Sequence, residues 1–246
     1  MDTNKKTART AGLVYLIILI GGMFAEFFVR SKVMVAGNAA LTAGNIMGSQ
    51  GLFRLGFVID IFSQVAYLIV ALLLYKLLKP VNKTIALLCV LLISISTAIA
   101  CLNLLNQFAS VELLSNATFA AAFSATQLNT LSYFFLDMQK YGYIIGDIFF
   151  GGWFIPLGYL VYKSGYFPKA LGIILNVAAL GFLIDFVGQF LFPNDSAFIS
   201  NIGMVLSAPC EWAFFFWLIF KGAKEALPAA KTTNQRHEMA NNLVIN

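Results

Sequence analysis

Five acidic residues of this 246-residue chain lie inside or beside long apolar stretches, where ionisable side chains are costly and point to a functional role. Carboxylates in such a setting can bind cations or polar solutes, and two that share a proton can catalyse hydrolysis. The alternative is structural, since buried carboxylates can pair with Arg54, Arg30 or nearby amides and hold helices together. The five residues are Glu26, Asp60, Asp147, Asp185 and Glu211.

Other reactive residue types are scarce. The only histidine, His237, lies in the polar C-terminal tail, and none of the three cysteines (Cys89, Cys101 and Cys210) belongs to a CxxC pair. We therefore expect no histidine-ligated zinc site, no histidine-based triad within the membrane, no disulfide framework and no cofactor. A carboxylate-only site for a divalent cation stays open, because oxygen ligands suit hard cations.

The composition is that of a membrane protein, with 60% hydrophobic and 11% charged residues. It excludes a soluble enzyme, a disordered tail and a nucleic-acid binder. Six stretches reach the roughly 20 apolar residues that a helix needs to cross a bilayer. They run approximately over residues 11–29, 52–78, 84–106, 141–162, 170–191 and 199–220. The sequence predicts an all-α polytopic bundle, with one domain over residues 1–222 and a flexible tail over residues 223–246.

Basic residues are distributed unevenly between the predicted loops, and this predicts the orientation. With the N-terminus in the cytoplasm, twelve fall on the cytoplasmic side: Lys5, Lys6, Arg9, Lys76, Lys79, Lys83, Lys163, Lys169, Lys221, Lys224, Lys231 and Arg236. Four fall on the other side: Arg30, Lys32, Arg54 and Lys140. The positive-inside rule then predicts that both termini are cytoplasmic. The excess of basic residues on the cytoplasmic side accounts for the net charge of +5, so the charge does not indicate a nucleic-acid partner.

Two segments on the outer side have helix-start signals but are too polar to span. Asn38 can cap a short helix that ends near Gly48. Ser124 and Gln127 form an S-x-x-Q capping box before an apolar stripe, which predicts an interfacial amphipathic helix leading into the fourth span. A single helix over residues 125–162 would be about 57 Å long, so a bend is expected near Gly142.

The predicted orientation places all five acids in the outer half of the bundle or at its midplane. Span two carries Gln64 on the same helical stripe as Asp60, and span three brings Asn103 to the same level. Gly203, Ser207 and Glu211 recur every fourth residue, a pattern that lets helices pack closely. We therefore predict an outward-facing acidic cavity, with Arg54 as the counter-charge and with no catalytic residue or metal ligand assigned. Its residues are Asp60, Asp185, Glu211, Arg54, Glu26, Asn103, Gln64 and Asp147.

A weak internal repeat relates spans two and four. Asp60-Ile61-Phe62 and Tyr75-Lys76 recur 87 residues later as Asp147-Ile148-Phe149 and Tyr162-Lys163. A parallel repeat of this kind occurs in transporters. Coincidence between two apolar helices that both end in a Tyr-Lys pair explains it equally simply.

Five segments of the chain carry a recognisable combination of motifs. They are ARTAGLVYLIILIGGMFAEFFVR at 8–30, GLFRLGFVIDIF at 51–62, ALLLYKLLKPVNKTIALL at 71–88, LDMQKYGYIIG at 136–146 and LVYKSGYFPKALG at 160–172. Together they resemble a bacterial family of membrane proteins known as domain of unknown function 4386. The resemblance implies about six helices in the bacterial inner (cytoplasmic) membrane and no established activity. It marks Glu26, Arg54, Asp60, Asp137 and Asp185 as family positions. Asp147 departs from this pattern, which weakens any catalytic role for it.

Three functions compete. The first is binding or passage of a small cationic or polar solute. The second is a structural or sensory protein without turnover, whose protein partner the sequence does not name. The third, an intramembrane hydrolase using Asp60 and Asp147, is favoured least, because Ile144-Ile145-Gly146-Asp147 lacks the first glycine of a GxGD motif.

Overall fold

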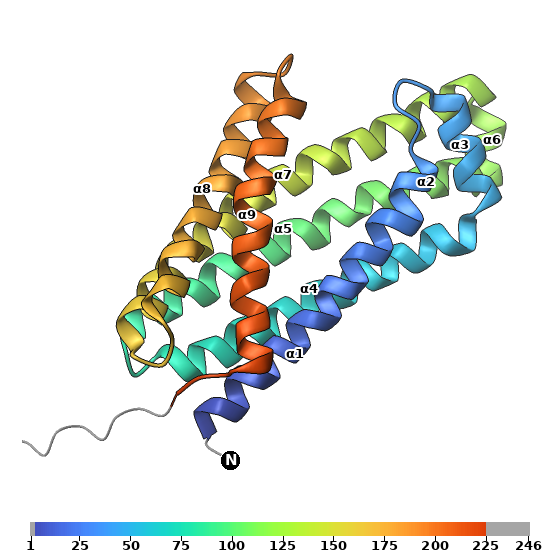
Figure 1. Ribbon diagram of the computed structural model, residues 1–246. Coiled ribbons are helices and arrows are strands. Elements are labelled where there is room, and N and C mark those ends of the chain that lie inside the picture. The colour runs from blue at the N-terminus through green and yellow to red at the C-terminus, as the bar shows by residue number, and fades with distance from the viewer. Residues whose placement is uncertain (1–2, 225–246) are drawn as a thin grey trace, which may run out of the picture.

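The computed structural model describes residues 3–224, and its regular elements are all helical (Figure 1). The long helices are α1 (Thr3–Phe24), α4 (Gln50–Leu78), α5 (Lys83–Ser115), α7 (Ala125–Ser164), α8 (Lys169–Leu191) and α9 (Ser196–Phe220). Helix α1 continues through a π-helix, η1 (Ala25–Arg30), into α2 (Ser31–Val33), and the connecting helices are α3 (Ala39–Gly48) and α6 (Ala117–Ala122). Six of these helical stretches are long and apolar enough to cross a membrane. The predicted all-α bundle of six spans is confirmed.

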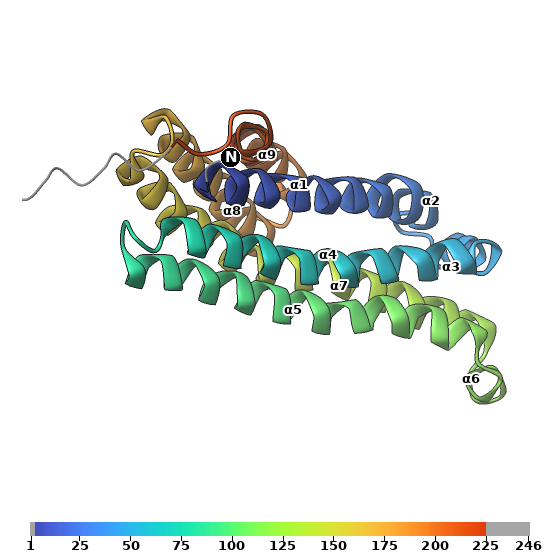
Figure 2. The ribbon, with the colours of Figure 1, turned by 90° about the horizontal axis from the view of Figure 1, so that it is seen from below.

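The bundle has two unlike ends. At one, which we call the terminal end, lie the start of α1, the turns α4–α5 and α7–α8, and the end of α9 (Figure 1). At the opposite or distal end, the α8–α9 hairpin separates from α1, α4, α5 and α7 (Figure 1). Seen at 90°, α1, α4 and α5 run side by side along the bundle (Figure 2). The two groups of helices therefore form a V whose arms diverge toward the distal end (Figure 1).

The main core fills the terminal half, where all six spans converge. Its largest fully buried side chains are aromatic: Trp153 and Phe154 on α7, and Phe214 and Phe215 on α9. The distal half has only a small second core, formed by Val29, Val33, Ile46, Phe53, Val111 and Leu136. Apolar packing therefore closes the bundle at the terminal end and leaves polar residues to organise the distal half.

The outer surface of the bundle is apolar. Phe62, Val205 and Phe220 are each about 70% exposed, and many further large apolar side chains are more than 40% exposed. A soluble monomer rarely exposes an apolar surface of this extent. The chain is a multi-pass membrane protein whose exposed faces are solvated by lipid.

Both predicted helix caps are present. Asn38 Oδ1 accepts a hydrogen bond from Leu41 N at 3.0 Å, and Ser124 and Gln127 form the reciprocal capping box. The helix predicted to begin after Ser124 is continuous with the fourth span, because α7 runs without interruption from Ala125 to Ser164. Helix α5 runs beside the first turns of α7 and buries α7 residues such as Ser132 there.

Gly142 has a packing role within the continuous helix α7. A Cβ at this position would overlap the Asn103 amide, which approaches from α5. Helices α4 and α7 run in the same direction, as the 87-residue repeat requires, and the repeat itself stays a prediction. The predicted flexible tail lies, from residue 225 on, outside the described residues.

Helices α8 and α9 pack through facing glycines, as the spacing of small residues predicted. A Cβ on Gly181 would lie 2.5 Å from the carbonyl oxygen of Gly203, and a Cβ on Gly203 would lie 2.7 Å from that of Gly181. Because backbone atoms cannot move aside as a flexible side chain can, this contact sets the spacing of the hairpin.

Replacing Gly181 with alanine should lower the free energy of unfolding by about 1–3 kcal/mol, the usual cost of overpacking. The measurement is the midpoint of thermal unfolding in detergent. Gly152→Ala is the matched control, because a Cβ there would meet no atom within 4 Å. If Gly181→Ala is as stable as Gly152→Ala, the close approach of α8 and α9 is wrong.

Candidate functional site

Two adjoining cavities lie along the bundle, one near its middle and one toward its distal end. The first, of about 340 Å³, is lined by residues of α1, α4, α5, α7, α8 and α9, and we call it the aromatic cavity. The second, of about 540 Å³, lies among η1, α2, α7 and α8, and we call it the distal cavity. Tyr143 and Asp147 line both. Each volume falls within the range of about 300–1,000 Å³ that is usual for small-molecule sites.

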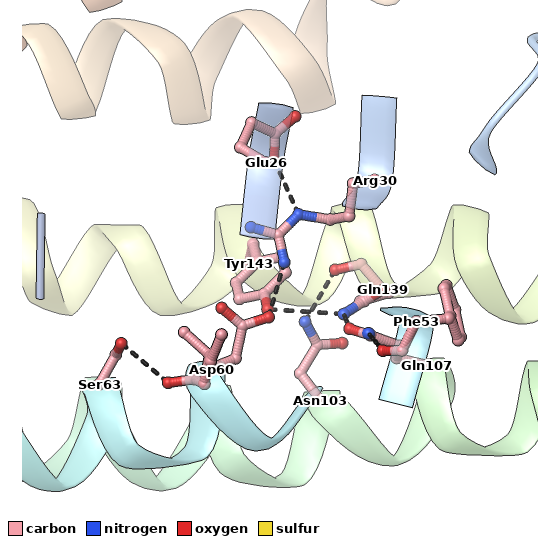
Figure 3. Close-up of polar contacts among 10 residues, drawn as sticks. Glu26, Arg30, Phe53, Asp60, Ser63, Asn103, Gln107, Gln139 and Tyr143 are labelled. Carbon is pink, nitrogen blue, oxygen red and sulfur yellow. Dashed lines mark hydrogen bonds and ion pairs between the residues drawn. The ribbon is translucent and has the colours of Figure 1, made fainter. Parts of the chain in front are cut away.

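Arg30 is the charged centre between these cavities. Its Nε donates to Glu26 Oε2 at 2.7 Å, and its Nη1 donates to Asp60 Oδ2 at 2.6 Å (Figure 3). The guanidinium carbon also lies 5.8 Å from the centre of the Tyr143 ring. Asp60 is only 6% exposed, so the ion pair joins η1 to α4 in a largely desolvated setting. Charge-assisted hydrogen bonds of this length are strong and directional.

The π-helix η1 carries both Glu26 and Arg30. A π-turn fits one additional residue per turn, and such segments are rare and recur at functional sites. The insertion changes the direction of the side chains that follow it, relative to a regular α-helix. The local backbone is therefore part of what presents Arg30 to Asp60.

Three further acids line the cavities without a cationic partner. Glu211 accepts a hydrogen bond from Tyr15 Oη, and Asp185 accepts one from Ser200 Oγ. Asp147 lies within electrostatic range of both Asp185 and Glu211. Within residues 3–224, the two ion pairs both involve Arg30. The carboxyl groups of Asp147, Asp185 and Glu211 are thus left without a basic side chain in the described part of the chain.

A buried ladder of amides lies beside the Arg30 centre and holds α5 against α7 (Figure 3). Asn103 Nδ2 donates to the Gln139 carbonyl at 2.7 Å, and Gln139 Nε2 donates to Gln107 Oε1 at 2.8 Å. Gln107 Nε2 reaches the Phe53 carbonyl on α4 at 3.3 Å. Asn103 is therefore a packing residue of this ladder and lines neither cavity.

The structure brings together six of the eight residues predicted for the cavity: Glu26, Asp60, Gln64, Asp147, Asp185 and Glu211. The predicted role of Arg54 as counter-charge is wrong. Arg54 is exposed and lies over the Phe108 ring at 5.8 Å, next to neither cavity, while Arg30 pairs with Asp60. Glu26 and Arg30, which are four residues apart on η1, form an ion pair.

The geometry gives little support to hydrolysis or metal binding. The Asp60 carboxylate is engaged by Arg30, whereas Asp147 has Asp185 as its charged neighbour on α8. Within the described part of the chain, no three His, Cys, Asp or Glu side chains are grouped so that they could hold a metal ion. A proton-sharing dyad of Asp60 and Asp147 therefore has no structural basis here.

Sequence reasoning missed the aromatic side chains of the site. Tyr15, Tyr143 and Trp212 line the cavities, and Tyr15 holds Glu211. A tyrosine within a membrane span is a usable signal, because its hydroxyl group needs a partner when it is buried. The π-helix has no comparable signal in the residues themselves.

Comparison with known proteins identifies relatives but no activity. The profile of a family described as a domain of unknown function (DUF4386) matches residues 10–222, which include every residue lining the two cavities. A protein of Archaeoglobus fulgidus described as an uncharacterized protein is 36% identical over 155 residues, which cover 63% of this chain and 76% of the relative. No solved structure matches the chain.

Replacing Arg30 with methionine should lower the free energy of unfolding by about 3 kcal/mol, because it leaves the Asp60 carboxylate buried without its cation. Adding Asp60→Asn should recover part of this loss. Arg54→Met is the matched control, and an exposed arginine should change stability by about 0.5 kcal/mol or less. Equal losses in the two single variants, measured by thermal unfolding in detergent, would contradict the assignment of Arg30 as the counter-charge.

Proposed function

We propose that this chain, which belongs to the DUF4386 family, binds a small cationic solute in its two adjoining cavities within the membrane. The single observation that carries the proposal is the charge balance of the cavity walls. Five carboxyl groups from five of the six spans line the cavities, and the Arg30 guanidinium pairs only with Glu26 and Asp60.

The remaining three acids, Asp147, Asp185 and Glu211, favour a ligand with a positive charge. Lys140 is the other basic residue on the distal cavity, and it is exposed and lies over the Tyr141 ring at 5.6 Å. Buried charges are tolerated when they are paired, so a cation entering beside Asp147, Asp185 or Glu211 would be favoured. An anion would meet net repulsion from the same walls.

The location of the cavities suggests the side from which the solute arrives. The basic residues of the described chain gather at the terminal end, and the positive-inside rule then puts that end in the cytoplasm. The cavities would face the outer side of a cytoplasmic membrane, above the buried aromatic core. In this conformation the protein would receive a solute from outside, as a binding protein or as one state of a transporter.

A structural function without a ligand is the main competitor. The Tyr15–Glu211 hydrogen bond joins α1 to α9, and the Arg30–Asp60 pair joins α1 to α4. Both contacts would stabilise the bundle even if no solute ever bound. Neither contact involves Asp147, so Asp147 distinguishes the two functions.

The test is thermal unfolding of the purified full-length chain in detergent, titrated with inorganic and organic cations. We expect at least one cation to raise the unfolding midpoint, since a ligand that binds only the folded state stabilises it. The rise should disappear in Asp147→Asn and persist in Asp137→Asn, a matched change on the same helix that lines neither cavity. If no cation stabilises the wild-type protein, the binding function is wrong and the structural function is favoured.

A further inference from the structure

We infer that the aromatic cavity is the binding site proper and that its ligand is an organic ammonium ion with an apolar body. The inference rests on the proposed function and narrows its ligand from any small cation to one chemical class. It follows from the walls of the cavity, from the carboxyl groups that face it and from the surface that it reaches.

Aromatic rings form much of the wall. The cavity is lined by Tyr15, Tyr67, Tyr143, Phe150, Phe182 and Trp212. Edge-to-face contacts hold several of them in fixed orientations, with ring centres 6.2 Å apart for Tyr15 and Tyr67 and 5.3 Å apart for Tyr67 and Phe150. Faces of Tyr and Trp rings attract ammonium groups, most strongly where water is excluded.

Two carboxyl groups complete the wall from different helices. Glu211 on α9 is 6% exposed, and Tyr15 Oη donates to its Oε1. Its second oxygen has no hydrogen-bond partner among the described residues, although the side chain lines the cavity. Asp147 on α7 lies within electrostatic range of Glu211. An ammonium group has donors for both carboxylates, while the rings contact its substituents.

A similar set of groups already holds a cation at the edge of this cavity. The Arg30 guanidinium is bound by the carboxylates of Glu26 and Asp60 and lies against the Tyr143 ring, and Asp60 and Tyr143 also line the aromatic cavity. Glu211, Asp147 and Tyr67 repeat this combination of two carboxyl groups and an aromatic ring in the same cavity, without a basic side chain. This internal example shows that the fold can stabilise an organic cation with such groups.

An inorganic cation fits the aromatic cavity less well. Calcium takes six to eight oxygen ligands, and magnesium requires a near-octahedral set. The cavity offers instead two carboxyl groups without a basic partner, hydroxyl groups such as those of Ser96 and Thr97, and a largely apolar wall. A volume of about 340 Å³ accommodates an organic body in addition to a charged group.

The cavity also reaches the apolar outer surface of the bundle. Met23 on α1 and Trp212 on α9 both line it, and they are 45% and 39% exposed. Helices α1 and α9 diverge from their contact at the terminal end (Figure 1). An apolar substituent can therefore extend toward lipid while the ammonium group remains beside Glu211.

The experiment compares 2-phenylethylammonium with its neutral analogue 2-phenylethanol and with Na⁺, K⁺, Mg²⁺ and Ca²⁺. Each is titrated against the full-length protein in detergent, and the shift of the unfolding midpoint is fitted for a dissociation constant. We expect saturable stabilisation by 2-phenylethylammonium alone. Tyr67→Leu should weaken its binding about tenfold, whereas Tyr67→Phe, which keeps the aromatic face, should weaken it much less.

Two further variants keep the result interpretable. Trp212→Leu removes an aromatic face at the partly exposed rim, so it should weaken binding even if Tyr67→Leu fails to fold. Tyr159→Leu is the matched control, since Tyr159 is 43% exposed on α7 and lines neither cavity.

The experiment distinguishes failure of the proposed function from failure of the ammonium inference. If an inorganic cation stabilises the protein through Asp147 and 2-phenylethylammonium does not, the proposed function stands and the ammonium class is wrong. Equal stabilisation by 2-phenylethanol would also overturn the inference, because the charge would then be irrelevant. If no cation stabilises the protein, both proposals fail.

Discussion

In a lipid bilayer every polar group must find its partner within the protein, and this constraint organises the whole distal half of the bundle. The amide ladder of Asn103, Gln107 and Gln139 satisfies it between α5 and α7. Serine hydroxyl groups satisfy it locally, as where Ser63 and Ser94 donate to the carbonyl four residues earlier. Arg30 on η1 provides the partner for the Asp60 carboxylate on α4. Polar pairing thus replaces apolar packing as the source of cohesion where the helices diverge.

The divergence of the helices in the distal half depends on the tight apolar packing of the terminal half. Aromatic packing of Trp153, Phe154, Phe214 and Phe215 fastens α9 to α7 at the terminal end. Facing glycines then keep α8 and α9 together as they leave the other helices. Because the hairpin is rigid and anchored at one end, it can remain apart from α1 and α7 at the other end. The cavities exist because the chain packs tightly at the terminal end and leaves the distal end divided.

Local properties could be read from the sequence, and relations between distant helices could not. The six spans and the caps at Asn38 and Ser124 depend on neighbouring residues, so their predictions were accurate. The carboxyl residues were found because a charge stands out in an apolar run. The partner of Asp60 was assigned incorrectly to Arg54, since the choice between Arg54 and Arg30 depends on the rotation of α1 after its π-turn. The length of α7 was misjudged because α5, which covers its first turns, was expected to end near residue 106.

Asp147, Asp185 and Glu211 are only partly compensated: Ser200 and Tyr15 donate hydrogen bonds to Asp185 and Glu211, but no basic side chain of residues 3–224 pairs with any of the three. A bundle built only for stability would gain by replacing such carboxyl groups with apolar residues, because unpaired buried charges oppose folding. Natural proteins depart from consistent pairing mainly at functional sites, where the missing partner arrives with the ligand. Asp147, Asp185 and Glu211 line the cavities, and the partly buried guanidinium of Arg30 shows what completes such a site. The incomplete pairing is thus the part of this fold that stability alone does not explain, and a bound cation would complete it.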